Sequence, residues 1–285
     1  MVQNNILLSI TGVCAALHLT FLAPNHVYSE ELVSHRAVYG MKLKSAVRGS
    51  GISGATGKMI YNFQSSCEGW ASDTNVKLVL FYKWGDIRST IWSFASWEAR
   101  NGSSYHFHSQ QAENGVITEV LKGIVKRRSN NRQIVVKFAT PMDTEITLHR
   151  ETLFPSMHLK KLFAAVKSDA KMINRVVFDG TSIDNPYEIN AVVSRGSPLR
   201  GTKRVNKLEQ ILNKAGFPTM KTQHFRLAFF ADIRQQMITE QHTPKFELGI
   251  DYRADGVARF IRQDFDTFSI DLELENIEKI NELPC

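Results

Sequence analysis

Two histidines have the spacing of a metal-ligand pair. His106 and His108 lie two residues apart in a stretch that alternates apolar and polar side chains. In a β-strand, residues i and i+2 point to the same face, so both imidazoles would face the same way and could ligate a metal. No third ligand follows at a regular spacing. The sequence therefore predicts histidines exposed on a sheet surface and no metal site.

Other patterns associated with catalysis are incomplete. No GxSxG motif is present, and nothing in the order of the serines, histidines and aspartates defines a triad. Residues 49–54 (GSGISG) match the dinucleotide pattern GxGxxG, but that pattern needs a preceding strand and a following helix. A strand-like segment follows here, so these glycines favour a flexible hairpin connection. The sequence predicts no cofactor and no enzymatic activity.

The three cysteines indicate a compartment. Cys14 lies in an uncharged apolar run, residues 6–23, which ends at Pro24, and a cleavage site is predicted after Ser29. This arrangement predicts a signal peptide over residues 1–29, although no Lys or Arg precedes the run. An uncleaved anchor is the alternative. Cys67 and Cys285 remain, and an even pair in an exported protein predicts a disulfide, with two unpaired thiols as the competing interpretation.

The charge balance points to anionic partners. The chain carries a net charge of +7, and its basic run falls at a predicted hairpin tip. A basic exported protein is attracted to anionic envelope polymers and lipid headgroups, whereas its compartment excludes nucleic acid. A solvated loop is the alternative interpretation of the run. The candidate residues are Lys126, Arg127, Arg128 and Arg132.

The elements that position these residues are predicted to be strands. Alternating segments recur about every ten residues from residue 35 to residue 274, and Asn-Gly turn signals stand at 101–102 and 114–115. Helical spacing appears over 156–166, with Ser156 as the expected N-cap, and over 205–215. So many antiparallel strands must protect their edges. Residues 30–285 are therefore predicted to form one mainly antiparallel all-β domain, a many-stranded β-spiral or open barrel-like sheet with one or two helices.

Aromatic side chains recur on the predicted strands. A concave sheet lined by them would suit an acyl chain or a peptide. Packing within an ordinary core is the alternative for each one. The candidates are Trp92, Phe94, Trp97, Phe107, Phe138 and Phe229.

Several short segments, in order and spacing, resemble the EipB family of periplasmic cell-envelope integrity proteins. They are residues 35–39 (HRAVY), 50–52 (SGI), 57–61 (GKMIY), 67–70 (CEGW), 94–98 (FASWE), 139–142 (ATPM), 152–158 (TLFPSMH) and 177–180 (VFDG). The resemblance covers nearly all of the chain after the leader. It implies a monomeric periplasmic protein with a β-spiral fold, a disulfide between Cys67 and Cys285, and no enzymatic activity.

The sequence and the resemblance together favour a non-enzymatic periplasmic protein that supports envelope integrity. It would bind an envelope lipid, a glycan or a periplasmic protein, and it would not span the membrane once the leader is removed. An envelope hydrolase acting on lipid or peptidoglycan is the alternative. That alternative requires a Ser/His/Asp or a His/His/acid cluster to form in the folded protein.

Overall fold

The computed structural model describes residues 31–128, 133–183, 185–194, 201–231 and 243–281. The predicted leader, Arg132 and Cys285 lie outside these residues. The strands are β1 (His35–Ala46), β2 (Ile52–Ser65), β3 (Gly69–Tyr82), β4 (Ile87–Ala99), β5 (Ser104–Glu113), β6 (Val116–Arg127), β7 (Ile134–Thr140), β8 (Thr144–Leu148), β9 (Met172–Val177), β10 (Tyr187–Ser194), β11 (Thr222–Ala231), β12 (Phe246–Arg253), β13 (Ala258–Asp264) and β14 (Phe268–Lys279). The helices are α1 (Pro155–Lys167) and α2 (Thr202–Lys214).

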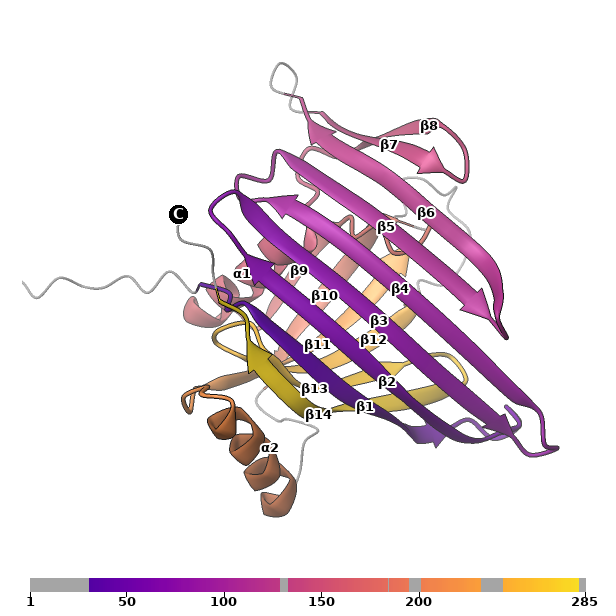
Figure 1. Cartoon of the computed structure of the whole chain (residues 1–285). Coiled ribbons are helices and arrows are strands. Elements are labelled where there is room, and N and C mark those ends of the chain that lie inside the picture. Colours follow the sequence, from indigo (N-terminus) through magenta and orange to yellow (C-terminus); the bar gives the residue numbers. More distant parts are fainter. Residues whose placement is uncertain (1–30, 129–132, 184, 195–200, 232–242, 282–285) are drawn as a thin grey trace, which may run out of the picture.

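All the described strands form one sheet. Its order is β8-β7-β6-β5-β4-β3-β2-β1-β14-β13-β12-β11-β10-β9, and the paired strands are antiparallel. The first and last strands of the chain therefore pair at the middle of the sheet, while β8 and β9 form its edges. The predicted mainly antiparallel, open barrel-like fold is confirmed (Figure 1).

The connection between the edge strands rolls the sheet. Leu153 follows β8 and forms a parallel bridge with Val177, at the end of β9. Phe178 then donates its backbone N–H to the Leu153 carbonyl, at 3.0 Å. One residue on, the Asp179 carbonyl accepts a hydrogen bond from the Tyr105 hydroxyl of β5, at 2.7 Å. The chain after β9 thus lies against the inner face of β5, which brings the two ends of the sheet together.

The inner face of the rolled sheet is filled by side chains. One cluster joins β1, β2 and β9–β14 to α1, where the Phe163 ring lies 6.2 Å from that of Phe225. A second cluster lies over β4–β8 and is covered by Phe154 and Phe178. Both of these covering rings are buried among aromatic neighbours, and Phe178 lies 5.4 Å from Phe107. The core thus has two parts, one for each half of the sheet.

The N-cap of helix α1 lies two residues earlier than the sequence indicates. Its N-cap is Phe154, which has no capping side chain, so Ser156 is not the N-cap as predicted. The cap is supplied from β4 instead, because the Glu98 carboxylate accepts hydrogen bonds from the backbone N–H groups of Ser156 and Met157, at 2.7 and 3.0 Å. A carboxylate at a helix N-terminus satisfies free N–H groups and complements the helix dipole.

The glycine-rich segment is only partly a turn. The turn follows β1, and β2 already begins at Ile52, so the segment from Ile52 onward belongs to a strand. Helix α2 ends at Lys214, close to the prediction, and Gly216 follows it with a φ of +75°. In the part of the chain that the structure describes, neither helix has the length and apolarity needed to cross a membrane.

Candidate binding groove

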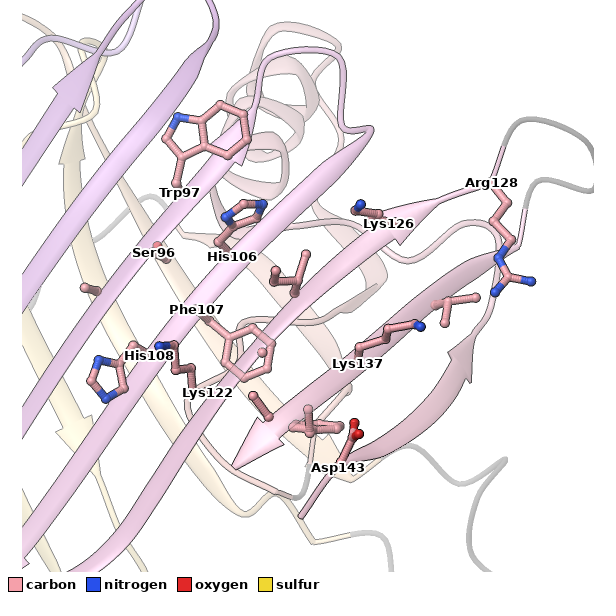
Figure 2. A pocket seen from close by; sticks show the side chains of 16 residues that line it. Ser96, Trp97, His106, Phe107, His108, Lys122, Lys126, Arg128, Lys137 and Asp143 are labelled. Carbon is pink, nitrogen blue, oxygen red and sulfur yellow. The ribbon is translucent and has the colours of Figure 1, made fainter. Parts of the chain in front are cut away.

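A groove of about 800 Å³ lies on strands β4–β7, on the face opposite to the core (Figure 2). We call it the outer groove. Its lining comes mainly from neighbouring residues of these four strands. On β5, Tyr105 and Phe107 are buried, whereas the alternate residues His106 and His108 are exposed and line the groove; Phe107 also contributes to the lining. The period-2 alternation of a strand therefore places the exposed groove residues on the outer face, while buried Phe107 and Phe138 reach the groove from the core.

The outer groove has a basic rim. Lys122 and Lys126 on β6 are exposed and have no carboxylate partner among the described residues. Lys137 on β7 and Arg128 share one partner, with Nζ and Nη2 at 3.4 and 3.5 Å from the Glu145 carboxylate. Asp143 is the one acidic residue of the described lining. The rim thus carries an excess of positive charge.

The floor of the outer groove is mainly apolar. Val135 lies on the groove side of β7 and is only 4% exposed. The Trp97 ring lies 5.5 Å from the His106 ring, in an edge-on arrangement. The remaining apolar lining consists of Ala95, Ile124, Ala139 and the rings of Phe107 and Phe138. An apolar floor beneath a cationic rim matches a ligand with an apolar body and an anionic group.

The structure divides the predicted basic patch. Lys126 and Arg128 line the outer groove, as Figure 2 shows, but Arg127 between them points to the other face. Its guanidinium donates to the carbonyls of Gly102, Arg150 and Thr152, at 3.2, 2.6 and 3.2 Å. Partial burial lowers the pKa of Arg127. Arg127 therefore holds loops together, and it is not available to a ligand in the groove.

Two basic residues of the outer groove, Lys122 and Lys137, were not singled out from the sequence. The signal was present, because Lys122 and Lys126 have the even spacing that places side chains on one face of a strand. His106 and His108 show the same spacing on the neighbouring strand. What the sequence could not give was the pairing of β5, β6 and β7, which brings these residues into one groove.

The six predicted lining aromatics do not share one surface. Four lie on the inner face in the second core cluster: Trp92, Phe94, Phe107 and Phe138. There Trp92 stacks on Phe94 at 5.6 Å and donates its indole N–H to the Ser109 hydroxyl at 3.0 Å. Phe229 lies in the other cluster, stacked on Phe246 at 4.3 Å. Trp97 lines the outer groove, and Phe107 and Phe138 also contribute to its lining from the core side.

The described residues contain no cluster of three or more histidines, cysteines or carboxylates that could hold a metal. His106 and His108 do share a face, as their spacing indicates, and both line the outer groove. Elsewhere, the His224 Nδ1 lies 2.7 Å from the Asp251 carboxylate, in a nearly buried pair. Within the described ranges, no hydroxyl side chain is hydrogen-bonded to the His224 ring.

Comparison with known proteins agrees with this geometry. A crystal structure of a beta-barrel-like protein, a domain of unknown function from Brucella abortus, matches with a TM-score of 0.77 at 22% identity, over 88% of this chain and 99% of that one. The fold is therefore that of the barrel-like all-β proteins. The family model described as EipB-like matches residues 28–281, so the chain belongs to the EipB-like family. The cell envelope integrity protein EipB of Brucella abortus (strain 2308) is 26% identical over 245 residues, covering 84% of this chain and 81% of the relative.

Proposed function

We propose that this protein is a non-enzymatic periplasmic protein that supports cell-envelope integrity by binding an anionic amphiphilic component of the envelope in the outer groove. The envelope role is supported by family membership and by the name of the relative. The binding role is supported by the groove itself, an apolar floor under a basic rim in which Lys122 and Lys126 have no carboxylate partner among the described residues. A site of about 800 Å³ is within the size range of small-molecule pockets.

The chemistry of the outer groove favours binding over turnover. Lys122 and Lys126 can neutralise phosphate or carboxylate groups through charge-assisted hydrogen bonds. Val135, Ile124 and Trp97 offer apolar surface to a chain attached to such a group. The inner face, in contrast, is occupied by the aromatic side chains of the two core clusters. The proposed ligand therefore binds outside the roll.

Charge reversal in the groove tests this proposal. We expect a Lys122→Glu/Lys137→Glu variant to fail to restore survival, on detergent and on a cationic envelope-disrupting peptide, in a strain lacking the protein. The matched control is Lys203→Glu/Lys214→Glu, which changes the net charge equally at exposed positions of α2. The control should restore survival as the wild type does. Equal rescue by the groove variant and the wild type, at equal periplasmic amounts, would rule out the groove as the working site.

The envelope-hydrolase alternative makes a different prediction. Its general base would have to come from a histidine oriented by a carboxylate, and His224 with Asp251 is the described pair of that kind. On our proposal, a His224→Asn variant that folds should still restore survival. Loss of rescue by a folded His224→Asn protein, together with retained rescue by the groove variant, would favour the hydrolase.

A further inference from the structure

The exposed apolar side chains gather at one end of the sheet. Twelve large hydrophobic residues are exposed in the part of the chain that the structure describes. Seven of them lie in or near the turns of the hairpins β1–β2, β3–β4 and β5–β6, and these three turns lie at the same end of the strands. They are Val47, Phe81, Trp84, Ile87, Ile91, Val116 and Ile117. Trp84 is 84% exposed, in the turn between β3 and β4. We call this surface the hairpin end.

The three turns are held side by side. Lys83 in the β3–β4 turn donates its backbone N–H to the Gly51 carbonyl of the β1–β2 turn, at 2.9 Å. Asn114 in the β5–β6 turn exchanges two hydrogen bonds with Ser89 of β4, at 2.8 and 2.9 Å. Figure 1 shows the β3–β4 and β5–β6 hairpins at the same right-hand end of the long strands. The apolar side chains are thus displayed on fixed neighbouring turns.

The opposite end of the same strands is polar. The turns that follow β2, β4 and β6 lie there. None of their described residues is an exposed large hydrophobic, and within five positions of these turns the described strands hold one, Ile124 on β6, against seven at the hairpin end. Scattered apolar residues are normal on a protein surface, but a patch that is concentrated at one end of the strands marks an interaction site. A tryptophan at the tip of such a patch is typical of the membrane interface, because the indole ring is partly apolar and partly polar.

Charge at the hairpin end indicates an anionic membrane. The exposed basic residues Lys44, Arg48, Lys83 and Arg88 surround the apolar tip. The acidic groups facing the same region are Asp86 and Glu113, with Asp266 on the neighbouring β13–β14 turn. A small positive excess remains. Apolar insertion would therefore provide most of the binding, and anionic headgroups would add to it.

We propose that the hairpin end is a membrane-docking surface, which inserts Trp84 and its apolar neighbours into the interfacial region of a bilayer that contains anionic phospholipid. Docking holds the protein reversibly on the membrane surface, with no segment crossing it. This inference is independent of the outer groove, since the groove lies on the face of β4–β7 and not at the turns.

Vesicle flotation tests this inference. Protein purified from the periplasm is mixed with vesicles of phosphatidylethanolamine and phosphatidylglycerol, or of phosphatidylcholine alone. We expect binding to both, severalfold stronger to the anionic vesicles. Trp84→Ser/Ile87→Ser should weaken binding at least tenfold. The matched control, Met172→Ser/Ile183→Ser, removes two other well-exposed apolar side chains, away from the hairpin end, and should bind as the wild type does.

A second readout reports on the inserted residue itself. Brominated lipids should quench the tryptophan fluorescence of the wild type, and Trp84→Phe should abolish the quenching while it retains most of the binding. The groove variant Lys122→Glu/Lys137→Glu should still bind vesicles, which separates this inference from the proposed function. Absence of vesicle binding, or binding unchanged in Trp84→Ser/Ile87→Ser, would overturn it. A concentration-dependent dimer lost in that variant, without vesicle binding, would assign the surface to a second copy of the chain.

Discussion

At the scale of the residue, Glu98 is the most informative side chain. It is 2% exposed, and its two carboxylate oxygens accept the first free N–H groups of α1. Burial raises the pKa of Glu98 to about 7, against an ordinary value of 4.5, although both hydrogen bonds oppose the shift. This residue joins β4 to α1, since α1 has no cap of its own.

Replacing Glu98 should change the pH dependence of stability. The folded pKa is raised, so between about pH 4.5 and 7 the folded protein holds a proton that the unfolded chain has lost. The free energy of unfolding should therefore fall as the pH rises through this window, by on the order of 3 kcal/mol. Glu98→Gln should flatten this dependence, as measured by urea unfolding at pH 5 and pH 8. The exposed Glu68→Gln control should keep it. An unchanged slope in Glu98→Gln would contradict the prediction.

At the scale of the element, Gly123 on β6 shows how closely the core is packed. A β-carbon added there would lie 2.5 Å from the Phe107 ring and 2.7 Å from the Lys137 carbonyl oxygen. These contacts coincide with the irregular β6–β7 pairing between Lys122 and Gly123. Only a residue without a side chain fits between the β6–β7 strand pair and the Phe107 ring.

Gly123→Ala should therefore lower the Tm by several degrees, because overpacking of a filled core costs about 1–3 kcal/mol. The matched control is Gly54→Ala on β2, where the nearest atom, on Phe81, lies at an ordinary contact distance of 3.4 Å. Thermal unfolding followed by circular dichroism compares the two. Equal melting temperatures for the two variants would show that β6 shifts to accept the methyl group.

Strands are also the level at which the sequence was most informative. Alternation and turn residues located the hairpins, because those signals are local. The sequence did not locate the partner of the α1 N-terminus, since Glu98 is 58 residues from Ser156 along the chain. It also did not separate Trp97 from Phe94, although their odd and even positions place them on opposite faces. Recognising that separation required knowing which face of β4 is buried.

At the scale of the whole molecule, the order of the strands brings the two ends of the chain together. Ile280 donates its backbone N–H to the Ser34 carbonyl at 3.1 Å, and the Ser34 hydroxyl accepts the N–H of Ser65 at 2.9 Å. Cys67 lies two residues further, in the exposed β2–β3 turn. Cys285 follows Ile280 by five residues in the sequence, a length of chain that spans at most about 17 Å. The sequence did not reveal the pairing of β1 with β14, which places the end of β14 beside the start of β1.

We therefore propose that Cys67 pairs with Cys285. The proposal is supported by the disulfide-bonded state of Cys67, and the bond would close a loop of more than 200 residues. By chain entropy, such a loop stabilises the folded state by up to about 5 kcal/mol. We expect Cys67→Ser and Cys285→Ser to lower the Tm equally and by several degrees. The double variant should lose no more than either single one, because both changes remove the same bond.

A reducing agent should lower the Tm of the wild type and leave the Tm of the three cysteine variants unchanged. Additive losses in the double variant would show that the two cysteines stabilise the protein separately, and equal melting curves with and without reductant would exclude the bond.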